Sequence, residues 1–373
     1  MVLVGGLALL SAALTLLYLL RSSSRPQLSH LTVLSEPALA WPGCASSTPP
    51  DCPVDPFRRP GMIYWGGGAS ETRWLPFPPS LASEPQFASM ETLDRSGELS
   101  ERDMDELGAP ERLMPEMARG GGAWARGKSV LFIGDSHDRN NVYHFCDAVG
   151  GRYNSWGDHT GGWCRVDRLE LTLAVWFLYG LPDQDYPWHA PNEPRPKTAG
   201  GRITEVFLPR MAADGMGNFT PDLVVMSSLF WDSDHMFEGY FSEFAVQRPA
   251  QHGLSFHELR FHQQQAALLI SQIRAQYTPQ VPLMYRSRHL RANNDGGRML
   301  RVTQMDQGWR AVCERAGVRV FDWGSKLEGY TDYYDGQQHF AAPGPATWLF
   351  GDMMLYYLRQ AMDVERWWAC FQP

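Results

Sequence analysis

The chain has 373 residues, enough for one large domain or two ordinary ones. Hydrophobic residues make up 44% of it and charged residues 20%, a balance that excludes a wholly disordered chain. With 33 Lys and Arg against 41 Asp and Glu, the formal charge is −8, which argues against binding to nucleic acid.

Residues 2–20 contain no charged side chain, and as a helix they span roughly 28 Å, close to the ~30 Å hydrocarbon core of a bilayer. We interpret residues 1–25 as an uncleaved membrane anchor, with a cleaved signal peptide as the alternative. Arg21 and Arg25 follow the uncharged stretch and favour a cytosolic location for the rest of the chain. Six cysteines and a glycosylation sequon at Asn218 favour the secretory lumen, and we expect the Golgi or the endoplasmic reticulum.

Residues 26–125 form a second region, a stalk rich in Ser and Pro followed by an acidic, partly helical cover at 84–118. From 126 to 373 the pattern changes to strand-length apolar runs that alternate with helical segments. This alternation predicts an α/β domain with a mostly parallel sheet covered on both faces. The predicted strands are 129–134, 171–177, 222–228, 281–286 and 318–323, and the predicted helices are 257–277, 299–317 and about 343–361.

The first of these strands leads directly into Gly134, Asp135 and Ser136. In a parallel sheet, ligands bind beyond the carboxyl ends of the strands. A serine at that edge and at a helix N-terminus lies near unpaired N–H groups that would stabilise an oxyanion. The alternative is that Asp135 or Ser136 only caps the helix.

A second polar group follows the last strand, where Asp335 and His339 precede the final helix. The histidine would accept the proton of a serine nucleophile, while the aspartate would orient the imidazole and stabilise its cation. The occurrence of both groups in one α/β domain predicts a Ser136–His339–Asp335 catalytic triad.

The motif FIGDSHDRN, with a late Asp-Gly and His, resembles the SGNH (GDSL-type) hydrolase superfamily. Over about 126–373 the sequence is most similar to its PC-esterase and trichome-birefringence-like branch of membrane-anchored glycan O-acetyltransferases and esterases. The resemblance implies a flavodoxin-like three-layer sandwich. It implies Ser136 as nucleophile, His339 as base and Asp335 as the orienting acid, and it places the oxyanion glycine at Gly180.

The sequence departs from the family pattern at two places. The family spacing is Asp-x-x-His, whereas three residues separate Asp335 from His339, so Asp332 is an alternative acid. The family's asparagine donor is absent from the block VVMSSLFWD, where Ser227 or Ser228 would replace it, and we assign the oxyanion hole to Ser136, Gly180 and Ser228.

Three further residues are candidates for substrate binding: Arg139, one turn into the nucleophile helix, its neighbour His137, and Trp231 in the middle block. The alternative for Arg139 is an ion pair with Asp135 or Asp138. We interpret His289, after the fourth strand, as a positional histidine. No spacing typical of metal ligands occurs, so we expect neither a metal nor another cofactor.

Six cysteines allow fifteen disulfide pairings, and spacing alone does not choose among them. A bridge between Cys146 and Cys164 would fix the loop that covers the site. Cys313 with Cys370 would join the last helices, and Cys44 with Cys52 would close a small loop in the stalk.

Together these features predict serine-dependent acyl transfer on carbohydrate, as an O-acetyltransferase or O-acetylesterase of the secretory lumen. The partners expected are a glycan acceptor and an acyl donor of unknown identity, supplied by a separate multi-spanning membrane protein. One alternative is a catalytically inactive SGNH-fold membrane protein that binds glycans or serves as a scaffold. Another is a cytosolic lipid esterase.

Overall fold

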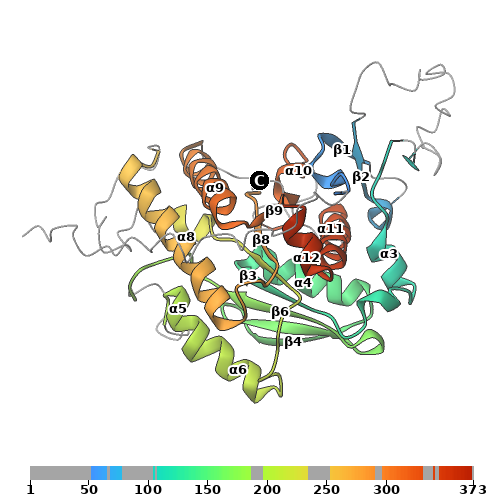
Figure 1. The fold of residues 1–373 in the computed structure, drawn as a ribbon, viewed down its shortest axis with the longest axis horizontal. Helices are drawn as coiled ribbons and strands as arrows, with labels where there is room; N and C mark the ends of the chain where they lie inside the picture. Colours follow the sequence, from blue (N-terminus) through green and yellow to red (C-terminus); the bar gives the residue numbers. More distant parts are fainter. Residues whose placement is uncertain are drawn as a thin grey trace, which may run out of the picture. The chain divides into compact units, whose positions relative to one another are not determined.

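A seven-stranded sheet with the strand order β4-β5-β6-β3-β7-β8-β9 forms the centre of the fold (Figure 1). The computed structural model describes residues 52–64, 68–77, 104–105, 107–185, 196–233, 253–289, 296–330, 339–340 and 344–371, which belong to one compact unit, Ala40–Pro373. The sheet consists of β3 (Ser129–Gly134), β4 (Arg152–Gly157), β5 (Gly161–Val166), β6 (Leu171–Phe177), β7 (Leu223–Met226), β8 (Leu283–Arg286) and β9 (Arg319–Phe321).

Five of the strands pair in parallel, in agreement with the predicted α/β class. β3 lies between β6 and β7, and β8 and β9 continue the parallel series. Every residue of β3 and β6 is buried, as expected for apolar strands covered on both faces. The predicted strands 129–134 and 171–177 are confirmed residue for residue.

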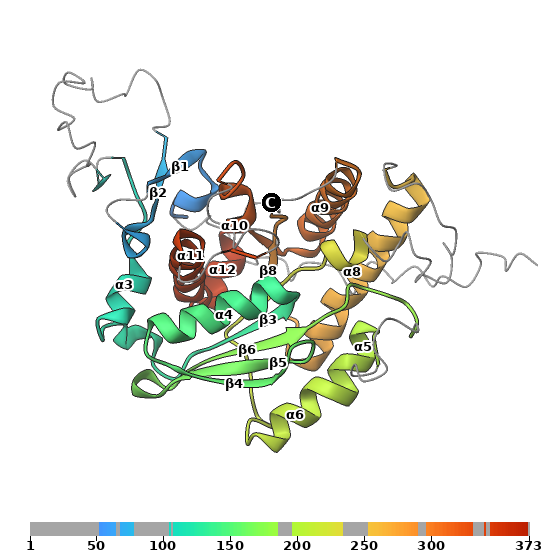
Figure 2. The ribbon, with the colours of Figure 1, turned by 180° about the vertical axis from the view of Figure 1, so that it is seen from behind.

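Helices cover both faces of the sheet (Figure 2). On one face, α4 and α11 share a core with Phe132 and Val225. On the other face, Trp309 of α9 stacks on Tyr285 of β8 at 4.9 Å between ring centroids. The helices that flank the sheet are α4 (Ser136–Ala148), α5 (Ala199–Arg202), α6 (Leu208–Ala213), α8 (Phe256–Gln276), α9 (Gly296–Ala316), α10 (Trp323–Lys326), α11 (Pro345–Ala361) and α12 (Val364–Ala369).

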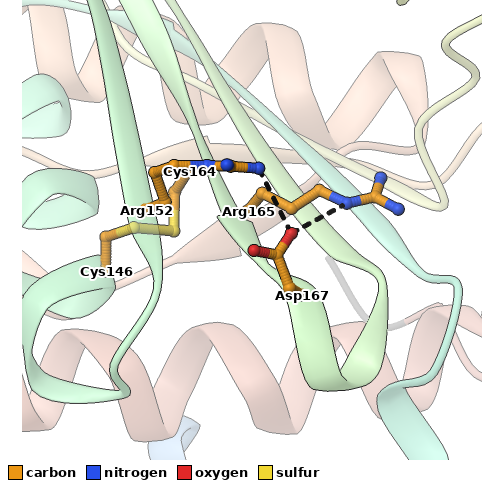
Figure 3. The surroundings of a disulfide bond; sticks show 5 residues. All are labelled: Cys146, Arg152, Cys164, Arg165 and Asp167. Carbon is orange, nitrogen blue, oxygen red and sulfur yellow. Dashed lines mark hydrogen bonds and ion pairs between the residues drawn. A yellow bond between two sulfur atoms is a disulfide. The ribbon is translucent and has the colours of Figure 1, made fainter.

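β4 and β5 extend the sheet as an antiparallel hairpin that the sequence analysis does not predict. The disulfide Cys146–Cys164 joins β5 to α4, and it confirms the first predicted pairing (Figure 3). Asp167 lies beside this bridge and pairs with Arg152 at 3.4 Å and with Arg165 at 3.8 Å. The bridge therefore fixes the hairpin to the helix that begins with Ser136.

The other two predicted pairings are wrong, because Cys370 forms a disulfide with Cys52 and Cys313 is a free, buried thiol. Cys52 belongs to a segment that precedes the sheet and packs against α11 from outside. This segment contains the hairpin of β1 (Gly61–Tyr64) and β2 (Arg73–Pro76) and the helix α3 (Leu113–Ala118). Its buried side chains, among them Phe57 and Met114, belong to the same core as Phe350 of α11.

No helix in the described ranges is both long and apolar enough to cross a membrane. The expected anchor at 2–20 lies outside these ranges, as does much of the acidic cover.

Asp352 of α11 accepts the N–H of Met114 at 2.6 Å, in the first turn of α3. Burial raises the pKa of its carboxyl to about 7, although the N–H groups and Arg112 oppose the shift. An unfolded chain would release this proton near pH 3.8. Between these pH values the folded state therefore holds a proton that the unfolded state has lost. The free energy of unfolding should fall as pH rises through this window, by up to about 1.4 kcal/mol per pH unit.

Replacing Asp352 by Asn keeps an oxygen acceptor and removes the charge. We expect the stability of the Asp352→Asn variant relative to the unchanged protein to increase between pH 5 and pH 8. Urea unfolding of both proteins at the two pH values measures this. If the two proteins differed in unfolding free energy by the same amount at both pH values, the raised pKa of Asp352 would be contradicted.

Candidate active site

Ser136 is the first residue of α4, directly beyond the carboxyl end of β3. Its neighbour Asp135 is the N-cap and accepts the N–H of His137 at 2.8 Å, while Asp138 accepts the N–H of Asp135 at 3.1 Å. A Cβ atom on Gly134 would lie 1.9 Å from an oxygen of Asp138, so only glycine fits at this turn. The capping role considered for Asp135 is therefore present, and it leaves the Ser136 hydroxyl at the positive end of the helix.

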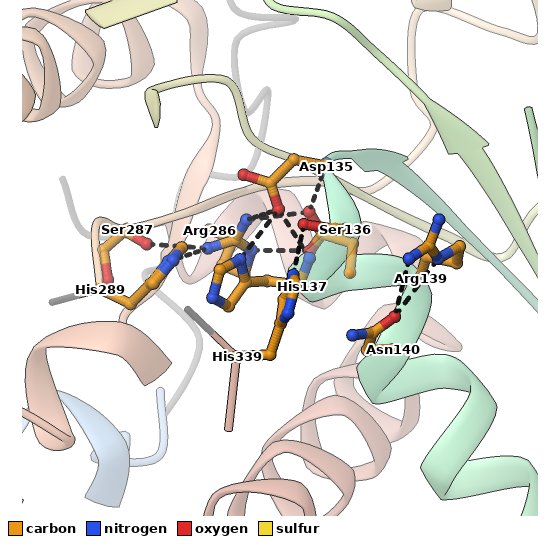
Figure 4. A network of polar contacts seen from close by, with 10 residues as sticks. Asp135, Ser136, His137, Arg139, Asn140, Arg286, Ser287, His289 and His339 are labelled. Carbon is orange, nitrogen blue, oxygen red and sulfur yellow. Dashed lines mark hydrogen bonds and ion pairs between the residues drawn. The ribbon is translucent and has the colours of Figure 1, made fainter. Parts of the chain in front are cut away.

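His339 lies beside this hydroxyl, with Nε2 2.8 Å from the Oγ of Ser136 (Figure 4). A nucleophile and a base within hydrogen-bonding distance are the central feature of a serine-dependent acyl-transfer site. The sequence brings the two residues together from opposite ends of the α/β domain, 203 positions apart. Asp335 and its alternative Asp332 lie outside the described residues.

Close to this pair lies Arg286, the last residue of β8, fully buried (Figure 4). Its guanidinium donates two hydrogen bonds to Asp138, at 2.6 and 2.9 Å, and it lies 3.4 Å from Asp135. Burial alone would raise the pKa of the Asp135 carboxyl, but Arg286 and His137 hold that pKa well below its usual range. The arginine thus fixes both carboxylates that shape the turn before Ser136, a role that the sequence analysis does not predict.

Three imidazoles, those of His137, His289 and His339, lie close together beside Arg286 (Figure 4). The ring of His137 lies 3.6 Å from that of His289 and 5.0 Å from that of His339, between centroids. Because a guanidinium can only donate, the Nδ1 of His289, 3.0 Å from Arg286, must accept, so His289 is neutral with its proton on Nε2. His137 is 1% exposed, so it supports the ring of His339 and offers little surface to a substrate.

On the other side of Ser136, Gly180 follows β6 with a φ of +85°, a conformation that favours glycine. A Cβ there would lie 2.4 Å from an oxygen of the buried Asp232. This carboxylate accepts the N–H of Leu181 at 2.6 Å and lies 3.1 Å from the Nε2 of His262. Asp232 thus holds the Gly180 turn in place. It also accepts the Ser228 hydroxyl at 2.5 Å, so that proton is directed at Asp232.

Two further candidates, Arg139 and Trp231, lie around the tip of the β4–β5 hairpin. Arg139 pairs with Asp158 at 3.6 Å, and not with Asp135 or Asp138. Trp231 is half-buried and packs edge to face against Tyr179, which precedes Gly180, at 5.2 Å. Asn218 is exposed in the turn before β7, at the edge of the sheet opposite the Ser136 hydroxyl.

A cavity of about 490 Å³ lies elsewhere, between β9, α9, α11 and the segment around Asp55. It contains neither Ser136 nor His339, and the one thiol that lines it, Cys313, has a pKa raised by burial. Among the described residues, no group of three His, Cys, Asp or Glu side chains is placed to hold a metal ion.

Comparison with protein-family models and with curated proteins finds no match for this chain. Solved structures give distant likenesses. A candidate GDSL-like lipase from Parabacteroides merdae is 11% identical, with 62% of this chain and 97% of that chain covered and a TM-score of 0.35. The acetylxylan esterase Axe2 from Geobacillus stearothermophilus is 13% identical, with coverages of 65% and 95% and a TM-score of 0.32.

LAE5, an α/β hydrolase enzyme from the metagenome of Lake Arreo in Spain, is 14% identical, with coverages of 68% and 100% and a TM-score of 0.31. At these identities and TM-scores the likenesses assign no activity to this chain. The functional argument therefore rests on the geometry of Ser136 and His339.

Proposed function

We propose that the chain is a serine-dependent acyl esterase or acyltransferase that forms an acyl intermediate on Ser136. The observation that carries the proposal is the 2.8 Å distance between the Ser136 hydroxyl and Nε2 of His339 at a helix N-terminus. His339 accepts the hydroxyl proton as Oγ attacks the carbonyl carbon of an ester, and returns that proton to the departing alcohol. Water or a sugar hydroxyl then takes the acyl group from the serine.

We further propose that the substrate is an O-acetylated carbohydrate or, in the transfer direction, a glycan acceptor of the secretory lumen. Half-buried aromatic rings at Trp231 and His159, next to the Gly180 turn, support a sugar ring as the binding partner. The two disulfides support an oxidising compartment, and the exposed sequon at Asn218 is compatible with it. A transferase would take its acyl group from a separate multi-spanning membrane protein, with the chain held at the membrane by residues 1–25.

A fluorophosphonate probe tests the proposal, because it reacts with serines that a neighbouring base activates. We expect peptide mass spectrometry to find an adduct on Ser136, and we expect the adduct to be absent from the His339→Ala variant. A folded, disulfide-bonded protein that stays unlabelled would favour the alternative, a non-catalytic glycan-binding or scaffolding protein.

A further inference from the structure

The cavity beside the edge strand β9 is rich in arginine side chains. Its volume of about 490 Å³ lies within the range of about 300–1,000 Å³ that is typical of small-molecule sites. Its walls come from β9, α9, α11, α12 and the segment that the Cys52–Cys370 disulfide joins to them. It is lined by three acidic side chains and by four arginines, Arg58, Arg310, Arg319 and Arg366. The cavity therefore has an excess of positive charge.

Arg319 is the first residue of β9, and its side chain lies on the face of the sheet that α11 covers. Phe321, two residues further along the strand, packs against Tyr357 of α11 at 5.8 Å between ring centroids. Residues two apart in a strand share a face. The guanidinium carbon of Arg319 lies 4.0 Å from the ring centroid of Trp367 in α12. This contact holds the cation over an indole ring in the wall of the cavity.

The Arg319 guanidinium has no carboxylate partner among the described residues. Its Nη2 donates to the carbonyl oxygen of Trp367, while its Nε is buried and has no acceptor in the described part of the chain. Asp55 is the acid that attracts it most strongly. The two oxygens of Asp55, however, accept the N–H of Phe57 and the hydroxyl of Tyr357, each at 2.9 Å. A guanidinium carries five N–H donors, so Arg319 has donors left for a ligand.

Two other arginines show what pairing does to such a group. Burial acts to lower the pKa of Arg286 and of Arg310, but the carboxylates in contact with them outweigh it and raise the pKa of both. For Arg319 the balance is reversed, because burial lowers the pKa and Asp55 opposes the change only in part. A buried cation without a counter-charge is costly, so an anion in the cavity would stabilise it.

We infer that this cavity binds a small organic anion whose carboxylate or phosphate group pairs with Arg319. A guanidinium presents its donors in a planar fork that matches both of these groups. The rings of Trp367 and Tyr356 line the same cavity and would contact an apolar part of the ligand. Ser136 and His339 do not line it, so the site is distinct from the one proposed for acyl transfer and does not depend on that proposal.

Isothermal titration calorimetry of the full chain with benzoate and with phenyl phosphate tests the inference. The two probes share an aromatic ring and differ in the anionic group, so their affinities show which group the cavity prefers. We expect at least one probe to bind, and we expect Arg319→Gln to weaken that binding about 10- to 100-fold, as loss of a charged hydrogen-bond donor does. Benzyl alcohol, a neutral analogue, should bind at least 10-fold more weakly than the better anion.

Arg274→Gln is a matched control. Arg274 is also buried, its Nη2 donates to the carbonyl oxygen of Ala316 at 2.6 Å, and its Nε has no acceptor among the described residues. Burial lowers the pKa of its guanidinium, as it does for Arg319. Arg274 does not line the cavity, however, so this variant should keep the affinity of the unchanged protein.

Arg58→Gln supplies a second test that leaves the buried cation in place. Arg58 is exposed and lines the same cavity, so its loss should weaken binding about 2- to 5-fold without a large effect on the fold. Thermal unfolding of each variant checks that the fold is retained.

Three results would overturn the inference. One is that neither benzoate nor phenyl phosphate binds the unchanged protein. Another is that Arg319→Gln, or Arg58→Gln should the first variant not fold, binds the better anion as tightly as the unchanged protein does. The third is an equal loss of affinity in Arg319→Gln and Arg274→Gln, which would indicate a general effect of deleting a buried cation.

Discussion

Replacement of Ser136 by Ala should lower the rate of ester hydrolysis by about 10⁴-fold or more, as loss of a triad nucleophile does. The reason is that the variant lacks the hydroxyl, 2.8 Å from Nε2 of His339, that is proposed to form the acyl intermediate. Steady-state hydrolysis of p-nitrophenyl acetate by the full chain measures the effect. The stability of the variant should stay close to that of the unchanged protein, because the change removes one partly exposed oxygen.

Non-additivity makes this prediction sharper. Residues that act as one catalytic unit lose little more when both are removed, so Ser136→Ala with His339→Ala should be no slower than either single variant. Losses that multiply in the double variant would show that the two residues act independently. Tyr143→Phe is a suitable control, since Tyr143 lies on the exposed side of the same helix.

Replacement of Arg286 by Met should lower the free energy of unfolding by about 3–5 kcal/mol. Arg286 is fully buried between Asp138 and Asp135, and its loss leaves two carboxylates in the interior without a counter-charge. Burial would lower the pKa of the guanidinium, but the two carboxylates raise it, so the arginine remains charged. Denaturant unfolding measures the change in stability.

A double-mutant cycle with Asp138→Asn distinguishes the loss of the Arg286–Asp138 ion pair from the loss of packing around the Arg286 side chain. We expect the double variant Asp138→Asn/Arg286→Met to be more stable than Arg286→Met alone, because one of the two uncompensated charges is then absent. Arg359→Met serves as the control, since Arg359 pairs with Glu111 at 2.8 Å on the surface and such pairs contribute about 0–1 kcal/mol. Equal losses of unfolding free energy in Arg286→Met and Arg359→Met would contradict the prediction that the buried ion pair contributes more than the surface pair.

The strands that form the centre of the sheet were predictable because burial on both faces requires continuous apolar sequence, as in 129–134 and 171–177. The hairpin of β4 and β5 was not predicted. β4 is an edge strand in which no residue is fully buried, and polar side chains such as Arg152 and Asn154 interrupt any apolar run. Its pairing depends on the neighbouring strands, and sequence pattern alone does not show it.

The residues of the candidate site likewise fall into those that the sequence identified and those that it did not. Ser136 and His339 were identifiable because motif and chain order place them at one edge of the sheet. Arg286 and Asp232 were not assigned, since their partners lie 148 and 51 positions away and only the strand order brings them together. The disulfides follow this rule too. The disulfide between Cys146 and Cys164, which are 18 residues apart, was predicted. The disulfide between Cys52 and Cys370, which are 318 residues apart, was not.

The bond between Cys52 and Cys370 has a consequence for biosynthesis. Its two halves lie near opposite ends of the described chain, so it cannot form before residue 370 has left the ribosome. Until α11 has been synthesised, the segment that contains β1, β2 and α3 lacks the helix against which it packs. Oxidative closure therefore follows the synthesis of the whole sheet and of α11 and α12. A fragment that begins at residue 126 would expose the α11 surface that Phe57 and Met114 cover, and it would leave Cys370 without its disulfide partner.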